Sequence, residues 1–252
     1  MTLARPVIWG HRGASFEAPE NTLAAFRLAR EQGADGVELD AQRCASGEIV
    51  VMHDESLGRT TGFAGLVTET AFSVIQTLDA GRGERVPLLS DVLEQVPIRI
   101  NVELKCDRAS DRGLTAEVVR LVRQAGAQDR VLLSSFNPLC LLRARLFAPE
   151  IPRALLFESE QKWWLRSALA APLLAVNSLH PEHVLATPDR IRRWRRRGYA
   201  VGCWTVDDPD LAAHLCESGV TSIITNRPAL MLNLCSIWGH PSGTPSNGTD
   251  IR

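Results

Sequence analysis

The stretch GVELD, residues 36–40, combines the alternation of a β-strand with two carboxylates placed two residues apart. Side chains two residues apart lie on one face of a strand, so Glu38 and Asp40 share a face and Leu39 takes the other. We expect Leu39 to face a covering helix and the two carboxylates to point into the interior of a barrel. Both lie toward the carboxyl end of the stretch, where the active sites of β/α barrels are built.

The stretch NVELK, residues 101–105, repeats this arrangement further along the chain. Glu103 and Lys105 are two residues apart and share one face, while Leu104 points to the other. We therefore expect a second charged pair at the carboxyl end of a second strand. Parallel strands end at the same edge of a sheet, so the two stretches predict a cluster of charge at one mouth of a barrel.

Around these stretches, short β-branched runs alternate with longer segments of helical period, the pattern of βα units around a parallel sheet. Eight to nine strands in about 250 residues favour an α/β fold of the TIM (β/α)8 barrel type. An open doubly wound sheet is the alternative. One strand candidate follows its predecessor too closely for a helix between them. The nine candidates are residues 7–9, 36–40, 49–54, 98–105, 131–136, 154–157, 174–179, 200–206 and 222–225.

The domain organisation follows from where this alternation stops. We expect one catalytic barrel domain over residues 1–238, with an irregular insertion, residues 55–87, over its C-terminal rim and a weak helix at 72–78. Residues 239–252 are rich in Gly, Pro, Ser, Asn and Thr and show no apolar period. This composition predicts a disordered tail.

Composition limits the partners of the chain. A formal net charge of −1 over 252 residues offers no general attraction to nucleic acid or to an anionic membrane. The N-terminus lacks a signal-peptide pattern, and the longest apolar stretch, residues 168–176, is too short to span a bilayer. Six cysteines without a C-x-x-C pair indicate reduced thiols. We expect a cytoplasmic protein, without stable membrane insertion, that is a monomer or a homodimer.

Two histidines add to the charged pairs at the predicted strand ends. His11 follows the strand at 7–9, and His53 lies at the end of the strand at 49–54. Any one of these ionisable residues could be a solvated rim residue or half of a structural ion pair. Their recurrence at four strand ends favours an active site instead.

Three carboxylates at one barrel mouth need a compensating positive charge. Two unit charges about 4 Å apart repel by roughly 4 kcal/mol at an effective dielectric constant near 20, so Glu38, Asp40 and Glu103 cannot all ionise alone. One divalent cation resolves the conflict, and oxygen ligands favour Mg²⁺, Ca²⁺ or Mn²⁺. Arg12 and Lys105 add fixed positive charge beside it. Together these groups describe a pocket for an anion, and a phosphate fits best.

His11 and His53 then remain for proton transfer, because histidine titrates near neutral pH. One can take a proton from the nucleophile and the other can give a proton to the leaving alkoxide. The sequence contains no P-loop and no G-x-G-x-x-G motif, so it offers no support for a nucleotide cradle.

The whole pattern resembles the glycerophosphodiester phosphodiesterases of the bacterial cytoplasmic type. The resemblance extends to about residue 228. It implies hydrolysis of a small-molecule glycerophosphodiester to sn-glycerol 3-phosphate and an alcohol. The motifs that carry it are HRGASFEAPENTLAAF, GADGVELDAQ, IVVMHDESLGRTT, VPLLSDVLE, NVELK, VLLSSFNP, GCWTVDD and GVTSIITNRP.

Transferred position by position, the resemblance also implies a role for each site residue. The histidines become acid and base, the three carboxylates become metal ligands, and Arg12 and Lys105 contact the phosphate. Trp204 lies beside the glycerol moiety. Glu20 and Asn21 order the loop after the first strand and begin the helix at 21–32, with Asn21 as its N-cap.

Two other functions share parts of this pattern. A related TIM-barrel phospholipase acting on lipid phosphodiesters would use the same metal, phosphate and histidine groups but would show an apolar rim for docking on lipid. A non-catalytic glycerol-phosphate binding protein would bind without turnover, and it would normally lack one histidine or acid. All seven key positions are filled here.

Overall fold

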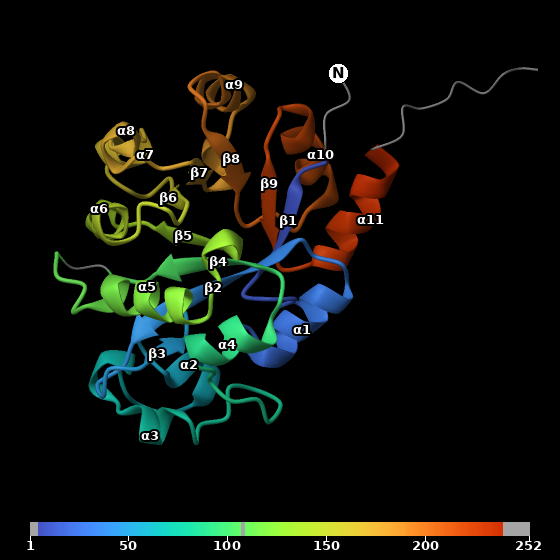
Figure 1. Cartoon of the computed structure of the whole chain (residues 1–252). Coiled ribbons are helices and arrows are strands. Elements are labelled where there is room, and N and C mark those ends of the chain that lie inside the picture. The colour runs from blue at the N-terminus through green and yellow to red at the C-terminus, as the bar shows by residue number, and fades with distance from the viewer. Residues whose placement is uncertain (1–4, 107–108, 239–252) are drawn as a thin grey trace, which may run out of the picture.

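The strands of this chain close into a barrel (Figure 1). The computed structural model describes residues 5–106 and 109–238. Within them, eight parallel strands form a continuous sheet that closes where β1 pairs with both β2 and β9. This confirms the TIM barrel and excludes the open doubly wound sheet. The barrel strands are β1 (Val7–His11), β2 (Gly36–Arg43), β4 (Arg99–Leu104), β5 (Val131–Ser135), β6 (Arg153–Phe157), β7 (Ser178–Pro181), β8 (Ala200–Cys203) and β9 (Ser222–Thr225).

The ninth predicted strand is real but does not belong to the barrel. β3 (Ile49–Val51) pairs antiparallel with the end of β2, with Ala41 opposite Val51. β2 runs beyond Asp40 and leaves the barrel, so its extension can form a hairpin with β3. The prediction that His53 lies at the end of a strand at 49–54 is therefore wrong, because β3 ends at Val51. The hairpin instead returns the chain to the mouth, where the Met52 amide donates to the Asp40 carbonyl at 2.9 Å.

Two further strand predictions differ from the structure at their edges. The segment predicted as a strand at 174–179 begins in a short helix, and β7 starts only at Ser178. The left-handed conformation of Ala175, with φ of 47°, ends that helix and turns the chain into the strand. The strand predicted at 200–206 ends at Cys203. In both places an apolar run continues beyond the ladder hydrogen bonds, so hydropathy alone misplaces the boundary.

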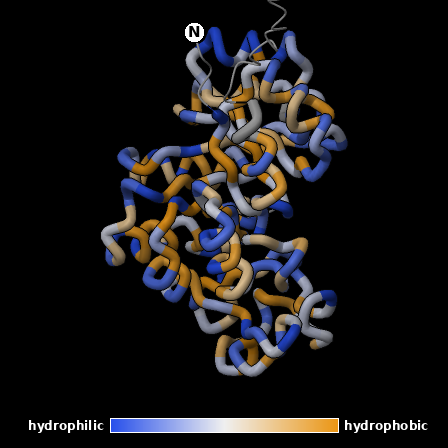
Figure 2. The backbone as a smooth tube through the Cα atoms, turned by 90° about the vertical axis from the view of Figure 1, so that its right-hand side faces the viewer, coloured by the Kyte–Doolittle hydropathy of each residue, from blue (hydrophilic) through white to orange (hydrophobic). Residues whose placement is uncertain are grey.

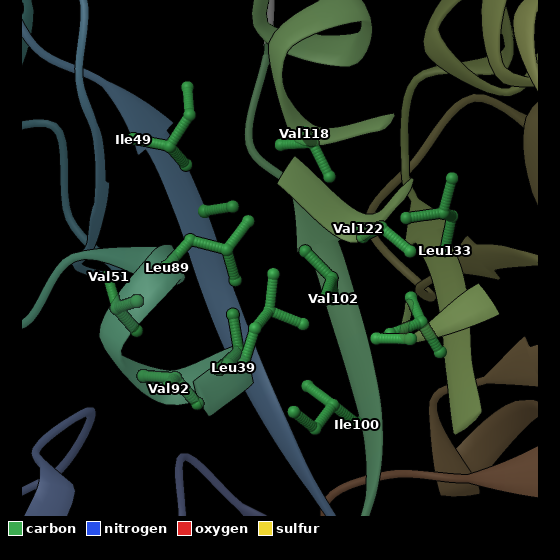
Figure 3. Close-up of a cluster of buried hydrophobic side chains, with 14 of the residues drawn as sticks. Leu39, Ile49, Val51, Leu89, Val92, Ile100, Val102, Val118, Val122 and Leu133 are labelled. Carbon is green, nitrogen blue, oxygen red and sulfur yellow. The ribbon is translucent and has the colours of Figure 1, made fainter. Parts of the chain in front are cut away.

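Helices cover the outside of the barrel (Figure 1). Between β2 and β5 on the outer face, Figure 3 shows Leu89 and Val92 of α4 near Leu39, and Val118 and Val122 of α5 near Val102. These residues are buried in one apolar cluster, as is Leu104. The predicted outward orientation of the two leucines is thus confirmed. The helices are α1 (Leu23–Glu31), α4 (Leu89–Gln95), α5 (Leu114–Gln124), α6 (Pro138–Phe147), α7 (Trp163–Arg166), α8 (Ala171–Leu174), α9 (Pro188–Arg196), α10 (Pro209–Glu217) and α11 (Pro228–Trp238).

The first helix begins one residue later than its predicted cap requires. Thr22, not Asn21, is the N-cap of α1, because its hydroxyl accepts a hydrogen bond from the Ala25 amide at 3.2 Å. Asn21 has a left-handed backbone, with φ of 57°, and its buried side chain donates to Asp40 Oδ2 at 2.8 Å. The N-cap prediction for Asn21 is wrong because a buried carboxylate takes its amide group.

Thr22→Ala is expected to lower the free energy of unfolding by about 1 kcal/mol, the usual loss for a missing N-cap. The hydroxyl of Thr22 also donates to the Pro19 carbonyl at 2.7 Å, so the variant loses that contact as well. Thr22→Ser keeps the hydroxyl and is the matched control. Denaturant unfolding measures both variants, and an unchanged Thr22→Ala would contradict the cap.

The insertion at 55–87 carries α2 (Gly58–Thr61), the 3₁₀ helix η1 (Val67–Glu69) and α3 (Phe72–Ile75), which is shorter than the helix predicted at 72–78. It packs with β3 around an apolar cluster of its own. Arg59 ties it to the loop after β1 through hydrogen bonds to Glu20 at 2.7 and 2.8 Å. The buried residues of the cluster are Cys44, Val50, Met52, Leu57, Val67, Ile75, Ala80 and Val86.

Hydropathy along the tube in Figure 2 follows this layering, with hydrophobic stretches inside and hydrophilic ones on many outer turns. In the part of the chain that the structure describes, no helix has both the length and the apolar character needed to cross a bilayer. Within that same part, 3₁₀ turns η2 (Gln128–Arg130) and η3 (His183–Leu185) connect elements. The tail predicted at 239–252 lies outside the described residues.

Candidate active site

Three buried carboxylates meet inside the mouth of the barrel. Glu38 and Asp40 come from β2 and Glu103 from β4, and each offers an oxygen within 4.8 Å of the other two. The parallel register places Asp40 directly beside Glu103, which brings the two predicted pairs together. The interior orientation inferred from the two-residue spacing is thus confirmed, and the group could hold a metal ion.

Burial and mutual repulsion disfavour the ionised form of these carboxylates. Burial raises the pKa of Glu38 well above its usual value, and Asp40 and Glu103 raise it further. Burial also raises the pKa of Glu103 to about 7, although Lys105 opposes the change. At Asp40, burial is outweighed by Lys105 and Arg12, so the pKa is lowered. Lys105 and Arg12 therefore supply too little positive charge to keep all three carboxylates ionised. A divalent cation with hard oxygen ligands fits this donor set.

Two basic side chains border the carboxylates. Lys105 Nζ lies 3.0 Å from Glu103 Oε1 and 3.7 Å from Asp40 Oδ1. Arg12 Nη1 lies 3.0 Å from Glu20 Oε1, and Arg12 Nε lies 3.4 Å from Asp40 Oδ2. Arg12 and Lys105 line one cavity of about 290 Å³ together with Glu38 and Glu103. The two basic side chains and two of the three carboxylates therefore face the same space.

His11 reaches this cavity from the end of β1. Its Nδ1 lies 2.7 Å from Asn226 Oδ1, and its Nε2 lies 4.0 Å from Glu38 Oε2. Burial, with help from Arg12, lowers the pKa of His11 to about 4. The expectation of a pKa near neutrality is therefore wrong for His11, because desolvation disfavours the imidazolium. At neutral pH the ring is uncharged, so one of its nitrogens carries a free lone pair.

His53 lines the same cavity from the hairpin and is more exposed than His11. Its Nδ1 donates to Asp54 Oδ1 at 2.6 Å, and Asp54 is held in turn by Arg59 Nε at 2.5 Å. The hydrogen bond from Arg59, together with His53, lowers the pKa of Asp54 to about 2 despite partial burial. Asp54 is therefore an ionised carboxylate at neutral pH, and it orients the ring of His53.

Trp204 forms an aromatic part of the cavity wall. Its indole Nε1 donates to the His180 carbonyl at 2.8 Å, and its ring meets Phe136 edge to face at a centroid distance of 5.4 Å. These two contacts fix the ring. Glu20 and Asn21 lie behind the cavity rather than in its wall, where Glu20 holds Arg12 and Asn21 holds Asp40.

Sequence reasoning missed three residues of the site. Asn101 lines the cavity and is fully buried, with neither amide atom hydrogen-bonded. The two-residue spacing from Glu103 could have found it. Asn226 and Asp207 stand behind His11, and their only signal was their presence in the motifs GVTSIITNRP and GCWTVDD.

A closed (β/α)8 barrel with acidic, basic and histidine side chains at its carboxyl-end mouth defines a TIM-barrel enzyme with a site for an anionic substrate. The model of the glycerophosphoryl diester phosphodiesterase family matches residues 11–230. The chain belongs to this family, and its class of reaction is phosphoric diester hydrolysis.

Individual proteins match over nearly the whole chain. A glycerophosphodiester phosphodiesterase of Caldanaerobacter subterraneus is 33% identical over 242 residues, which cover 91% of this chain and 98% of the relative. A phosphodiesterase of Oleispira antarctica, solved in complex with the product sn-glycerol-3-phosphate, superposes with a TM-score of 0.85 at 30% identity, covering 92% of this chain and 97% of its own. A glycerophosphodiester phosphodiesterase of Agrobacterium tumefaciens gives a TM-score of 0.72 at 30% identity and covers 91% and 100%.

Proposed function

We propose that this protein hydrolyses glycerophosphodiesters to sn-glycerol 3-phosphate and an alcohol, with one divalent cation and two histidines. The observation that carries the proposal is one cavity lined by Glu38 and Glu103 of the carboxylate group, by the two basic side chains and by the two histidines. The product bound by the Oleispira antarctica relative supports a small substrate of this kind.

In this proposal, charge holds the phosphate at the mouth. Glu38, Asp40 and Glu103 would hold Mg²⁺, Ca²⁺ or Mn²⁺, and Arg12 and Lys105, which border these carboxylates, would bind the phosphate oxygens. When bound, the cation would stabilise negative charge on the phosphoryl oxygens as a Lewis acid. Arg12 and Lys105 already line the cavity, so an incoming phosphate would be placed between positive side chains and the cation.

The histidines divide the proton transfers. His11 takes the proton of the attacking hydroxyl at Nε2 as the new phosphorus–oxygen bond forms. His53 gives a proton to the alcohol oxygen as the old phosphorus–oxygen bond breaks. The attacking hydroxyl belongs either to water or to the glycerol carbon next to the ester, since an internal hydroxyl has the advantage of proximity. Internal attack releases the alcohol and forms a cyclic glycerol phosphate, which water then opens to sn-glycerol 3-phosphate. Each transfer contributes about 10² to 10⁴ in rate.

Trp204 is proposed to bind the glycerol moiety. Its fixed indole ring presents a flat apolar face, on which the C–H surface of a small polyol can pack without polar partners. Glu20 and Asn21 act indirectly, because they hold Arg12 and Asp40 in place. A single domain over 1–238, a cytoplasmic location and a monomer or homodimer stay predictions from the sequence.

A panel of glycerophosphodiesters tests the proposal. Glycerophosphocholine, glycerophosphoethanolamine, glycerophosphoglycerol and glycerophosphoinositol are each incubated with the Mg²⁺-loaded protein and with chelated protein. We expect sn-glycerol 3-phosphate from at least one diester, and only with the cation. Preferential cleavage of phospholipid in vesicles would favour the related phospholipase instead. Binding of a diester without turnover would favour the non-catalytic binding protein.

A further inference from the structure

A chain of hydrogen bonds runs from His11 to a carboxylate outside the cavity wall. His11 Nδ1 lies 2.7 Å from Asn226 Oδ1, and Asn226 Nδ2 donates to Asp207 Oδ2 at 2.6 Å. Neither Asn226 nor Asp207 lines the cavity, so neither is placed to touch a substrate. They join the end of β9 and the loop after β8 to the end of β1.

The carboxylate fixes which way the Asn226 amide points. Asp207 Oδ1 accepts from the Asn226 backbone amide at 2.8 Å and from the Thr225 hydroxyl at 2.9 Å, which clamps the carboxylate in place. Its other oxygen can only accept, so the atom of Asn226 that faces it must be the NH₂ group. The reversed amide would place two acceptor oxygens 2.6 Å apart. Asn226 Oδ1 must therefore face His11.

The orientation of the amide decides the position of the proton on His11. An amide oxygen is an acceptor only, so the imidazole nitrogen beside it must carry hydrogen. The Ser15 hydroxyl lies 2.8 Å from Asn226 Oδ1 and 2.7 Å from the His11 carbonyl. Its single hydrogen serves only one of these oxygens at a time, so Asp207 alone orients the amide. In the neutral ring, Nδ1–H leaves the lone pair on Nε2, the nitrogen that lies nearer to Glu38.

We infer that Asp207 and Asn226 are positioning residues that hold neutral His11 as the Nδ1–H tautomer and so present a basic Nε2 to the substrate. The inference rests on the proposed function, in which Nε2 takes the proton of the nucleophile. A ring held in the other tautomer would present N–H to the nucleophile and could not accept its proton. The fixed amide thus performs the orienting task that a carboxylate performs directly beside the histidine in other hydrolases.

The substitution Asp207→Asn should reverse the hydrogen bonds between residue 207, Asn226 and His11. The new side chain must keep its oxygen toward the Asn226 backbone amide and the Thr225 hydroxyl, so its NH₂ group faces the side chain of Asn226. Asn226 then turns its amide over and presents NH₂ to His11. Nδ1 must accept, and the proton moves to Nε2. The double variant Asp207→Asn/Asn226→Asp restores an acceptor beside Nδ1, and with it the original tautomer.

The experiment measures tautomer and rate separately. Two-dimensional ¹H–¹⁵N spectra of the imidazoles are recorded on the Mg²⁺-loaded protein at one pH where His11 is neutral, and His11→Ala identifies the signals. We expect Nδ1–H in the wild type, Nε2–H in Asp207→Asn, and Nδ1–H in the double variant. We expect kcat to fall by about 10²- to 10⁴-fold in Asp207→Asn with KM little changed, as for the loss of the base itself, and to recover in the double variant.

Nε2–H in the wild type would overturn the inference without any variant, which keeps the test valid if Asp207→Asn fails to fold. An unchanged tautomer in folded Asp207→Asn would also overturn it. If the tautomer switches as expected while kcat stays constant, the positioning chain stands, and the role of His11 as base in the proposed function fails instead.

Discussion

Removal of the divalent cation is expected to abolish turnover, and added Mg²⁺, Ca²⁺ or Mn²⁺ is expected to restore it. Burial raises the pKa of Glu38 and of Glu103, because ionised carboxylates in this group lack compensating positive charge. A divalent cation supplies that charge. Activity on a glycerophosphodiester is measured after removal of tightly bound metal and again after addition of each cation. Full activity in excess chelator would contradict a cation site.

Substitution of a ligand separates cation binding from folding. Glu103→Gln should weaken the binding of Mg²⁺, measured by calorimetry, while the chain still unfolds in one thermal transition. Cation at about 100 times its Kd should stabilise the wild type by about 2.7 kcal/mol. That increment should be lost in Glu38→Gln, whose midpoint in chelator should equal or exceed that of the wild type because a buried repulsion is gone. Glu94→Gln, at an exposed carboxylate on α4, is the matched control.

His11→Ala and His53→Ala are each expected to lower kcat by about 10² to 10⁴, the effect of a missing proton-transfer group. Cation affinity should stay near that of the wild type, because neither ring belongs to the carboxylate group. The combined variant should lose less than the product of the two single losses, since both rings serve one reaction. Steady-state kinetics and calorimetry measure the two quantities.

The histidines also have a control within the chain. His214 is an exposed residue of α10, so His214→Ala should leave kcat unchanged. Multiplicative losses combined with weakened cation binding would contradict the proton-transfer role and would make His11 or His53 a ligand. His11 Nε2, 4.0 Å from Glu38 Oε2, is the nitrogen on which this alternative depends.

Local physical chemistry made part of this molecule predictable from its sequence. A β-strand alternates faces, so two carboxylates in GVELD and a Glu–Lys pair in NVELK had to point the same way once their leucines packed under helices. The ladder of parallel strands then placed Asp40 beside Glu103. The alternation of strand and helix patterns favoured the barrel, and the two-residue spacing predicted the carboxylate group. Both depend on residues a few positions apart and on one repeated unit.

Tertiary structure decided what depends on partners far away in the sequence. Asn21 looks like a helix cap, but the buried carboxylate of Asp40 claims its side chain, and Thr22 caps α1 instead. His53 reaches the mouth after an antiparallel hairpin, because β2 extends beyond the barrel and its extension pairs with β3. Both outcomes reflect competition between a local preference and a stronger distant contact.

The electrostatics of His11 belong to the same category. Its lowered pKa comes from burial, which no sequence pattern states, and its hydrogen-bond partner Asn226 lies 215 residues further along the chain. Closure of the barrel between β1 and β9 brings these two residues together. Spacing in a sequence determines which face of a strand a side chain takes. Desolvation and long-range hydrogen bonds determine its charge and its tautomer, and these exist only in the folded barrel.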